Sequence, residues 1–232
     1  MQRSVGAKAT TTQTCVSVIL ETLKGSLDTP NMVKVNHDPF ETLIITIISQ
    51  NTSDTNTMRA FEKLSNSFEI SPQALANASI SQLEACLHVA GLYRSKAKTI
   101  QTVSRIIIER FNGSLKPILA LPLGEARKTL TEMPGVGPKT ADVVLLFSAN
   151  HPTVPVDTHV NRVSKRLGLA PTNGGYEEVR LSLQSLFTAE DYLAVHLLLI
   201  ALGRKFCKAL KPRCAECPVN GYCPSNTCGV SV

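Results

Sequence analysis

Apolar residues recur along most of the chain at the spacing of α-helices, and alternation typical of β-strands is confined to short runs such as Thr153–Val156. The segment 40–50 is apolar nearly all round, which is typical of a central buried helix. Other segments predict further helices, most of them with one apolar face: 14–25, 53–68, 93–113, 140–149, 158–168 and 189–206. The pattern therefore predicts an all-α protein.

The ends of these segments carry helix start and stop signals. Ser53 and Asp54 are N-cap residues for the segment 53–68, in which Met58, Phe61 and Leu64 follow at helical spacing. Gly25 is placed to end the first helix, and Asn112-Gly113 is placed to end the long helix before it. Short β-branched runs are interpreted as connectors.

Composition adds a weaker signal about partners and location. The chain has 232 residues, of which 43% are hydrophobic and 18% charged, and its net charge of +6 favours a polyanionic partner. No apolar run is long enough to span a membrane, since Leu43–Ile48 is far too short. The first residues lack the apolar stretch and cleavage site of a secretion signal, so we expect an intracellular protein without a membrane partner.

The stretch MPGVGPKTADVV, residues 133–144, contains two glycines, two prolines and a Lys-Thr pair. A nucleotide-binding loop of the form G-x-x-x-x-G-K-[ST] needs glycine at the positions held here by Met133 and Pro138. The segment before it is helical rather than a strand. These differences exclude that interpretation.

The same stretch fits a helix, a tight turn and a second helix. Gly135 and Gly137 permit backbone conformations closed to other residues, and Pro138 suits the first turn of the second helix. Residues spaced to pack the two helices together are Leu130, Met133, Val136, Ala141 and Val144. This pattern predicts a helix–hairpin–helix, in which the turn amides of Gly135, Val136 and Gly137 bind a DNA phosphate. The alternative is an ordinary αα-hairpin.

Lys139 begins the second helix of this hairpin and has two interpretations. Taken alone, it is a phosphate contact or a solvated lysine. A nucleophilic role requires a neutral amine, whereas an unperturbed lysine has a pKa of about 10.4, so the site must disfavour the charge. A carboxylate partner is available in Asp157, which opens the segment 158–168 and is also an N-cap candidate. On that segment His159 and Arg162 are candidates for phosphate contacts, with packing roles as the alternative.

Four of the seven cysteines crowd into a C-terminal segment with the spacing C-x6-C-x2-C-x5-C: Cys207, Cys214, Cys217 and Cys223. In a reducing compartment four thiolates at this density indicate a metal site, either a four-iron cluster or zinc, and spacing alone does not choose between them. Basic residues surround them, which suits DNA phosphate. Cys15, Cys86 and Cys228 lie outside the pattern and are taken as buried or incidental.

With these motifs together, and with the segments GLYRSKAKTI and VPVDTHVNRV, the sequence resembles the endonuclease III family of DNA glycosylases. The match runs from about Pro39 to Pro224. The resemblance implies a helix–hairpin–helix glycosylase fold with a six-helix barrel domain at 33–151, the hairpin being at about 130–144. It implies a cluster domain made of 1–32 plus 152–232, whose loop 207–223 holds a [4Fe–4S] cluster.

The resemblance also implies an enzyme of base excision repair, acting on double-stranded DNA that carries damaged bases or abasic sites. Lys139 corresponds to the lysine that attacks the sugar C1′ and forms a Schiff base, and Asp157 to the aspartate that assists it. β-Elimination then cleaves the strand. Oxidised or damaged pyrimidines are the expected substrates of a monomeric enzyme in a prokaryotic cytoplasm or nucleoid.

Two further positions follow from the resemblance. Leu92 matches a residue that inserts into the base stack, and Asn51 aligns with a second inserting position that is usually glutamine; here Gln50 stands one place earlier. Leu92 in the core and Asn51 as a helix C-cap are the alternatives. For function, the alternatives are a G·T or G·U mismatch thymine or uracil glycosylase, and a DNA-binding module without catalysis.

Overall fold

The computed structural model describes residues 6–28 and 38–226, and all regular structure within these ranges is helical, as expected for an all-α protein. The chain forms two compact units. One lies within residues 34–151. The other combines chain from before residue 34 with chain from Pro152 onward.

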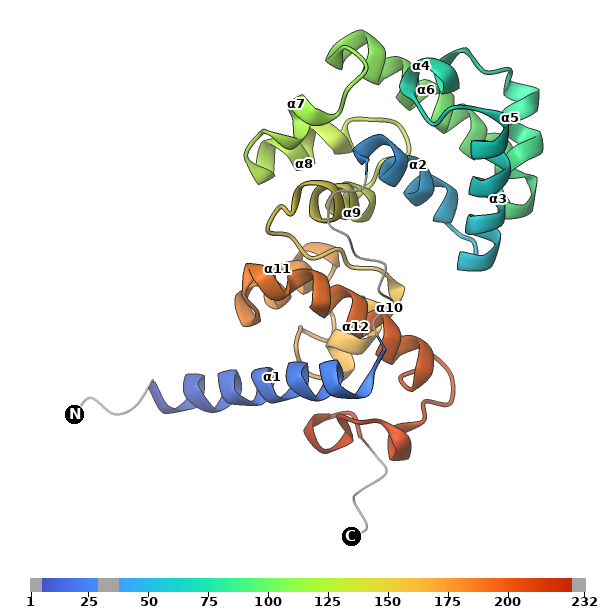
Figure 1. The fold of residues 1–232 in the computed structure, drawn as a ribbon. Coiled ribbons are helices and arrows are strands. Elements are labelled where there is room, and N and C mark those ends of the chain that lie inside the picture. The colour runs from blue at the N-terminus through green and yellow to red at the C-terminus, as the bar shows by residue number, and fades with distance from the viewer. Residues whose placement is uncertain (1–5, 29–37, 227–232) are drawn as a thin grey trace. The chain divides into compact units, whose positions relative to one another are not determined.

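The unit within residues 34–151 begins and ends with helices that pack against each other, α2 and α9 (Figure 1). Between them α4 and α5 pack on the long helix α6, and α3 packs on α5. Its elements are α2 (Pro39–Ser49), α3 (Asp54–Ser67), α4 (Pro72–Asn77), α5 (Ile80–Leu87), η1 (His88–Ala90), α6 (Tyr93–Phe111), α7 (Lys116–Leu119), α8 (Leu123–Thr131) and α9 (Pro138–Ala149).

Helix α2 is the central buried helix that its composition predicts. Asp38 caps it, because a side-chain oxygen accepts a hydrogen bond of 2.9 Å from the Glu41 N–H. Its fully buried side chains are Leu43, Ile44, Ile47 and Ile48, which join one continuous apolar cluster with residues of α3, α5, α6, α8 and α9. Residues 115–128, which lead into the hairpin, belong to this unit too, since Ile118 on α7 is buried in the same cluster.

Helix α3 shows one difference from the sequence pattern. Ser53 is its N-cap, as expected, and Leu64 is fully buried. Met58, however, is 58% exposed, because the face turned to the core carries the smaller residues Thr57 and Ala60. The expectation that Met58 shares the apolar face is therefore wrong.

In the second unit, α1 packs against α12, and α10 packs against both α11 and α12. The first helix runs one residue past the expected stop at Gly25, to Ser26. The elements are α1 (Gly6–Ser26), α10 (Thr158–Arg166), α11 (Tyr176–Leu186), η2 (Ala189–Asp191), α12 (Tyr192–Lys205), η3 (Cys214–Glu216) and η4 (Asn220–Tyr222).

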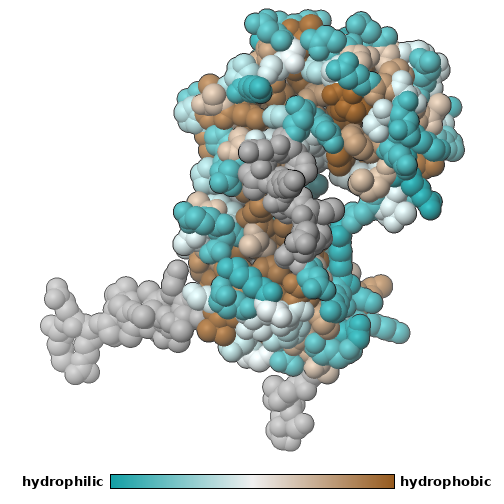
Figure 2. Space-filling model, in the orientation of Figure 1, coloured by the Kyte–Doolittle hydropathy of each residue, from teal (hydrophilic) through white to brown (hydrophobic). Residues whose placement is uncertain are grey.

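The surface drawn in Figure 2 mixes hydrophilic and hydrophobic residues over both units. Within the described ranges no single helix is long and apolar enough to cross a membrane, although the bent pair Tyr176–Leu186 and Ala189–Lys205 passes that test jointly, by length and composition only.

Candidate functional site

The predicted hairpin is present between α8 and α9. Gly135 has φ of 75°, a left-handed conformation that suits glycine, and the Val136 N–H donates to the Met133 carbonyl at 3.1 Å. Pro138 occupies the first turn of α9, as predicted. The residues expected to pack the two helices are all buried: Leu130, Met133, Val136, Ala141 and Val144.

Two of the three turn residues differ from expectation in detail. Gly137 is the N-cap of α9 with φ of −87° and ψ of 177°, an extended conformation open to any residue. A Cβ added there would meet nothing within 4 Å, so the glycine leaves open space in front of the helix rather than relieving strain. Val136 is 3% exposed and its side chain belongs to the core. Its N–H is bonded to the Met133 carbonyl, so Val136 supports the turn from within rather than facing a phosphate.

Lys139 is the second residue of α9 and is half-buried. A buried ion pair fixes the helix behind it. Arg127 on α8 donates from Nε to Asp142 Oδ1 at 2.7 Å and from a terminal nitrogen to Oδ2 at 3.1 Å, and Asp142 is fully buried. This two-pronged contact holds the two helices of the hairpin in one register.

Sequence reasoning missed the role of Gln50. Its side-chain N–H donates to the Gly135 carbonyl at 3.0 Å and to Thr140 Oγ1 at 3.4 Å, so the end of α2 is tied to the hairpin turn. Gln50 is also the C-cap of α2, a role considered instead for Asn51. Asn51 follows it with φ of 54° and an exposed side chain. The pairing of Gln50 with a residue 85 positions away has no local sequence signal.

Leu92 is exposed and not part of the core. Its side chain is 62% exposed, and its backbone has φ of 47°, directly after Gly91 with φ of 65°. A leucine in the left-handed region is strained, and such strain gathers at functional sites. Leu92 therefore stands at the start of α6 in a conformation that packing alone does not favour.

Asp157 is the N-cap of α10, as predicted, and accepts a hydrogen bond of 2.7 Å from the Val160 N–H. The connector before it is buried and fixed on both sides. The His196 ring donates from Nδ1 to the Pro155 carbonyl at 2.8 Å, and the Val156 N–H donates to the Tyr176 hydroxyl at 3.4 Å. Asp157 belongs to the second unit, whereas Lys139 belongs to the unit within 34–151.

Arg162 serves packing rather than a free phosphate contact. Its guanidinium donates to the carbonyls of Cys207 at 2.9 Å and Gly203 at 3.1 Å, and to His159 Nδ1 at 3.2 Å. A Cβ added at Gly203 would lie 2.9 Å from that same Nδ1. His159 is thus half-buried beside α12, with its contact to DNA still a prediction.

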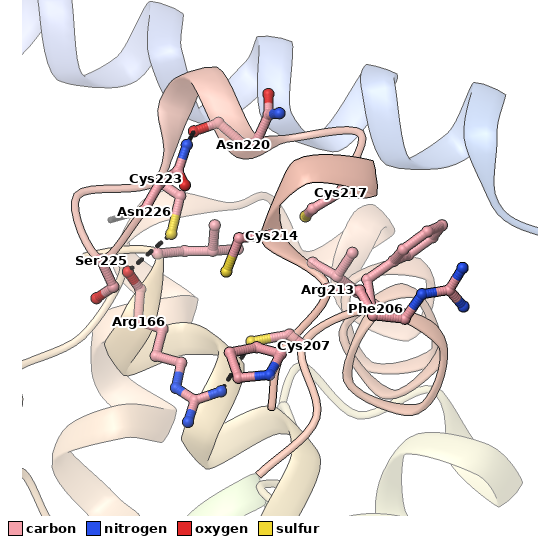
Figure 3. A pocket seen from close by; sticks show the side chains of 13 residues that line it. Arg166, Phe206, Cys207, Arg213, Cys214, Cys217, Asn220, Cys223, Ser225 and Asn226 are labelled. Carbon is pink, nitrogen blue, oxygen red and sulfur yellow. Dashed lines mark hydrogen bonds between the residues drawn. The ribbon is translucent and has the colours of Figure 1, made fainter. Parts of the chain in front are cut away.

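The four cysteines of the C-terminal pattern surround one cavity of about 220 Å³ (Figure 3). Arg166 donates to Cys207 Sγ at 3.5 Å, and the Cys223 thiol donates to the Arg166 carbonyl at 3.3 Å. Burial raises the pKa of the Cys217 and Cys223 thiols. A bound cation would offset that burial by stabilising the thiolates.

This donor set fits an iron–sulfur cluster. The four cysteine side chains line one shared cavity. Thiolates are the ligands of [4Fe–4S] clusters. When bound, the cluster cross-links four points of a segment that has little regular structure.

The surroundings of the cysteines are basic, and the other cysteines lie apart. The side chains of Arg204, Lys205, Lys208, Lys211 and Arg213 are exposed, with Arg213 paired to Glu216. Cys86 is buried and donates to the Lys63 carbonyl at 3.7 Å, Cys15 is half-buried, and Cys228 lies outside the described residues.

Known protein families match both the region that contains the hairpin and the cysteine segment. Residues 44–189 match the HhH-GPD superfamily of base excision DNA repair proteins, and residues 207–223 match the iron–sulfur binding domain of endonuclease III. Endonuclease III of Sulfolobus acidocaldarius is 38% identical over 185 residues, covering 79% of this chain and 81% of that protein. Endonuclease III of Bacillus subtilis is 36% identical over 189 residues, covering 82% of each.

Solved structures give the same result. A trapped covalent intermediate of endonuclease III with DNA matches 92% of this chain and 96% of its own, with a TM-score of 0.79 and 32% identity. A thermostable thymine-DNA glycosylase matches 95% of this chain and 98% of its own with a TM-score of 0.72 but only 20% identity, which shows a shared fold alone.

The chain belongs to the HhH-GPD superfamily of base excision DNA repair proteins and, within it, to the endonuclease III family. It is a DNA-binding enzyme, a DNA glycosylase with abasic-site lyase activity, and it carries a [4Fe–4S] cluster, whose binding domain matches residues 207–223.

Proposed function

We propose that this enzyme excises oxidised or otherwise damaged pyrimidines from duplex DNA, with Lys139 as nucleophile and Asp157 as its carboxylate partner. The observation that carries the proposal is the position of Lys139, half-buried in the first turn of α9 directly after the open turn at Gly137. The positive end of a helix dipole disfavours an adjacent ammonium ion and so favours the reactive amine.

The chemistry proceeds in two steps. The neutral amine of Lys139 attacks C1′ of the damaged nucleotide, and the base departs with the electron pair of the bond that held it and takes up the proton that the amine loses. The ring oxygen then leaves C1′ with its electron pair and takes a proton from water, so that the ring opens and the lysine nitrogen is joined to C1′ as a protonated Schiff base. A proton is then lost from C2′ to water and the bond from C3′ to oxygen breaks, which nicks the strand and releases its downstream part with a 5′ phosphate. Asp157, held by its N-cap hydrogen bond, stabilises the positive charge that develops.

Binding to the duplex falls to the hairpin and to two loops in the same unit. The backbone amides of Gly135 and Gly137 hold a phosphate at the N-terminus of α9, while Val136 between them keeps its N–H on the Met133 carbonyl and supports the turn. Leu92 and Asn51, both exposed and both left-handed, enter the stack where the base has been extruded. His159 adds a contact from α10.

Organisation and location form part of the proposal. The unit within 34–151 serves as the helical barrel domain that carries the hairpin, and the other unit serves as the cluster domain. The enzyme acts as a monomer on damaged or abasic duplexes in the cytoplasm or nucleoid of a prokaryote. A DNA substrate and bacterial and archaeal relatives support that location.

Borohydride trapping tests the nucleophile and the lesion class together. The cluster-loaded protein is incubated with duplexes that contain an abasic site, thymine glycol, a G·T mismatch or a G·U mismatch. Wild type should form a covalent adduct on the abasic and thymine glycol duplexes, and Lys139→Gln should lose it. Lys128→Gln, at an exposed lysine on α8, is the matched control and should retain the adduct.

The outcomes separate the alternatives. Adducts of Lys139→Gln at the wild-type level would assign the nucleophile to another amine. Excision confined to the mismatched duplexes would replace damaged pyrimidines with thymine or uracil as substrate. In Asp157→Asn, excision should fall while duplex affinity is retained, since the amide oxygen can still accept the cap hydrogen bond.

A further inference from the structure

Lys96 is a buried lysine that the reaction above does not use. Its side chain is 4% exposed, and burial lowers the pKa of its ammonium group. Its amine donates to two backbone carbonyls, Ile48 at 2.8 Å and Ala90 at 2.9 Å. An amine buried in this way cannot reach a DNA phosphate. Its hydrogen bonds instead join two segments of the chain, those that contain Ile48 and Ala90.

Those two segments are the ones that lead to the inserting residues. Ile48 lies near the end of α2, three residues before Asn51, and Ala90 is the last residue of η1, two residues before Leu92. The backbone N–H of Lys96 also donates to the Leu92 carbonyl, at 3.0 Å. One residue of α6 therefore contacts both loops at their bases.

Both loops have conformations that need support. Asn51 and Leu92 are non-glycine residues in the left-handed region, and they persist there only when the surrounding structure holds them. Leu92 is mostly exposed, so its side chain adds little packing of its own. Hydrogen bonds to the neighbouring carbonyls therefore add to the packing of Ile48 and Ala90 in fixing the loop bases.

The same network reaches the phosphate-binding turn. Gln50, between Ile48 and Asn51, donates to the Gly135 carbonyl at 3.0 Å. A Cβ added at Gly135 would lie 2.5 Å from a methyl group of Thr99, on the same helix as Lys96. The hydrogen bonds of Lys96 and Gln50 thus link the two loops and the hairpin turn beside the first half of α6.

We propose that Lys96 is a positioning residue that sets the spacing of the Asn51 and Leu92 loops, so that both side chains enter the gap left by an extruded base. The inference rests on the proposed function, in which these two residues contact DNA. A lysine suits the task because its long stem crosses the core and its amine offers three donors. An apolar residue of equal length leaves both carbonyls without a partner.

The test compares Lys96→Met with Lys98→Met, an exposed lysine two residues along the same helix. Each protein is assayed on a thymine glycol duplex and on single-stranded DNA with an abasic site, in which no base is extruded from a stack. Because small misplacements near a reacting centre are costly, Lys96→Met should lose about tenfold or more in duplex excision. Its cleavage of the single strand should stay near the wild-type rate, as both rates should in Lys98→Met.

A fluorescence measurement isolates insertion from chemistry. In a Lys139→Gln background, 2-aminopurine placed beside the lesion brightens when the neighbouring base leaves the stack. Lys96→Met should reduce that signal at saturating protein. Leu92→Ala should reduce it too, and the combination should be no worse than the stronger single change, because both act on one element.

Each alternative result has a distinct meaning. Equal losses on duplex and single strand would show a general structural role for Lys96 and overturn the proposal, as would an unchanged duplex rate. Where Lys96→Met fails to fold, Lys96→Gln, which keeps a donor on a shorter side chain, is measured in its place. Wild type inactive on both substrates would instead remove the proposed function itself.

Discussion

The unit within residues 34–151 and the cysteine segment at the end of the other unit are held together by different means. The first has a continuous apolar cluster that draws on α2, α3, α5, α6, α8 and α9. In the described residues 206–226, by contrast, Val219 is the one buried hydrophobic residue, and the regular structure is limited to the short turns η3 and η4.

The contrast indicates which part of the molecule is stable in the absence of the cluster. Burial of aliphatic side chains stabilises the unit within residues 34–151 in proportion to the area removed from water. A segment with so little apolar burial cannot offset its own ordering entropy, so binding of the cluster supplies that free energy. Changes to the two regions should therefore have effects of different kind as well as size.

Loss of a cluster ligand should have the largest effect. Cys217→Ser should abolish the yellow-brown visible absorption and open residues 206–226 to proteolysis, while the helices of the 34–151 unit resist cleavage. Absorption spectra and limited proteolysis with mass spectrometry measure both. Cys86→Ser, at a buried cysteine outside the pattern, should keep the absorption. An intact cluster in Cys217→Ser would contradict the ligand assignment.

In the unit within residues 34–151, breaking the buried ion pair of Arg127 and Asp142 should be the costliest single change. Arg127→Met leaves the fully buried Asp142 carboxylate without its partner, and the free energy of unfolding should fall by about 3–5 kcal/mol. Arg110→Met, which removes an exposed pair with Glu132, should cost about 0–1 kcal/mol. Urea titration measures both, and equal losses would show that burial does not govern these pairs.

Alanine substitutions at the two turn glycines should separate backbone strain from phosphate binding. Gly135→Ala places a methyl group in the left-handed region and against Thr99, so the free energy of unfolding should fall by about 1–3 kcal/mol. Gly137→Ala meets neither obstacle and should change it by less than about 0.5 kcal/mol.

Duplex affinity, measured by fluorescence anisotropy, should distinguish their roles. We expect weaker binding from both variants, because a methyl group at residue 137 projects into the space proposed for the phosphate. Wild-type affinity of Gly137→Ala would place the phosphate elsewhere.

The smallest expected effect is the pH dependence that Lys96 gives to stability. Burial lowers its pKa from the ordinary value of 10.5, so the unfolded chain binds this proton more firmly than the folded protein does. The stability of wild type relative to Lys96→Met should therefore rise as the pH increases toward 10.5, and remain level below the folded-state pKa. Urea titrations of both proteins at several pH values measure the difference, and a falling difference would contradict the direction.

Local features of the fold and site were predictable from sequence. Glycine, proline and helical spacing located the hairpin, and the five residues expected to pack its helices are buried, because such packing depends on neighbours a few positions apart. The N-caps Ser53 and Asp157 were found for the same reason. The cysteine spacing indicated a metal site, but the choice of cluster over zinc needed the resemblance.

Features that depend on distant partners were not predictable. The contact of Gln50 with Gly135 joins residues 85 positions apart, and Lys96 is buried although lysine is ordinarily exposed. The prediction for Met58 was wrong for a related reason, since the core beside α3 accepts the small residues Thr57 and Ala60 instead. In each case the deciding factor is the shape of another element that the local pattern does not contain.

The pairing of α1 with α12 has a consequence for synthesis on the ribosome. The buried face of α1, which includes Val16, Ile19, Leu20 and Leu23, is covered within its unit by chain that follows residue 151. At roughly 5–20 residues per second, the ribosome needs about ten seconds or more to deliver α12 after α1 has emerged. Residues 34–151 are all synthesised before α12 appears, so that unit has its own packing partners while the buried face of α1 is still uncovered. Early chaperone contact should therefore concentrate on α1.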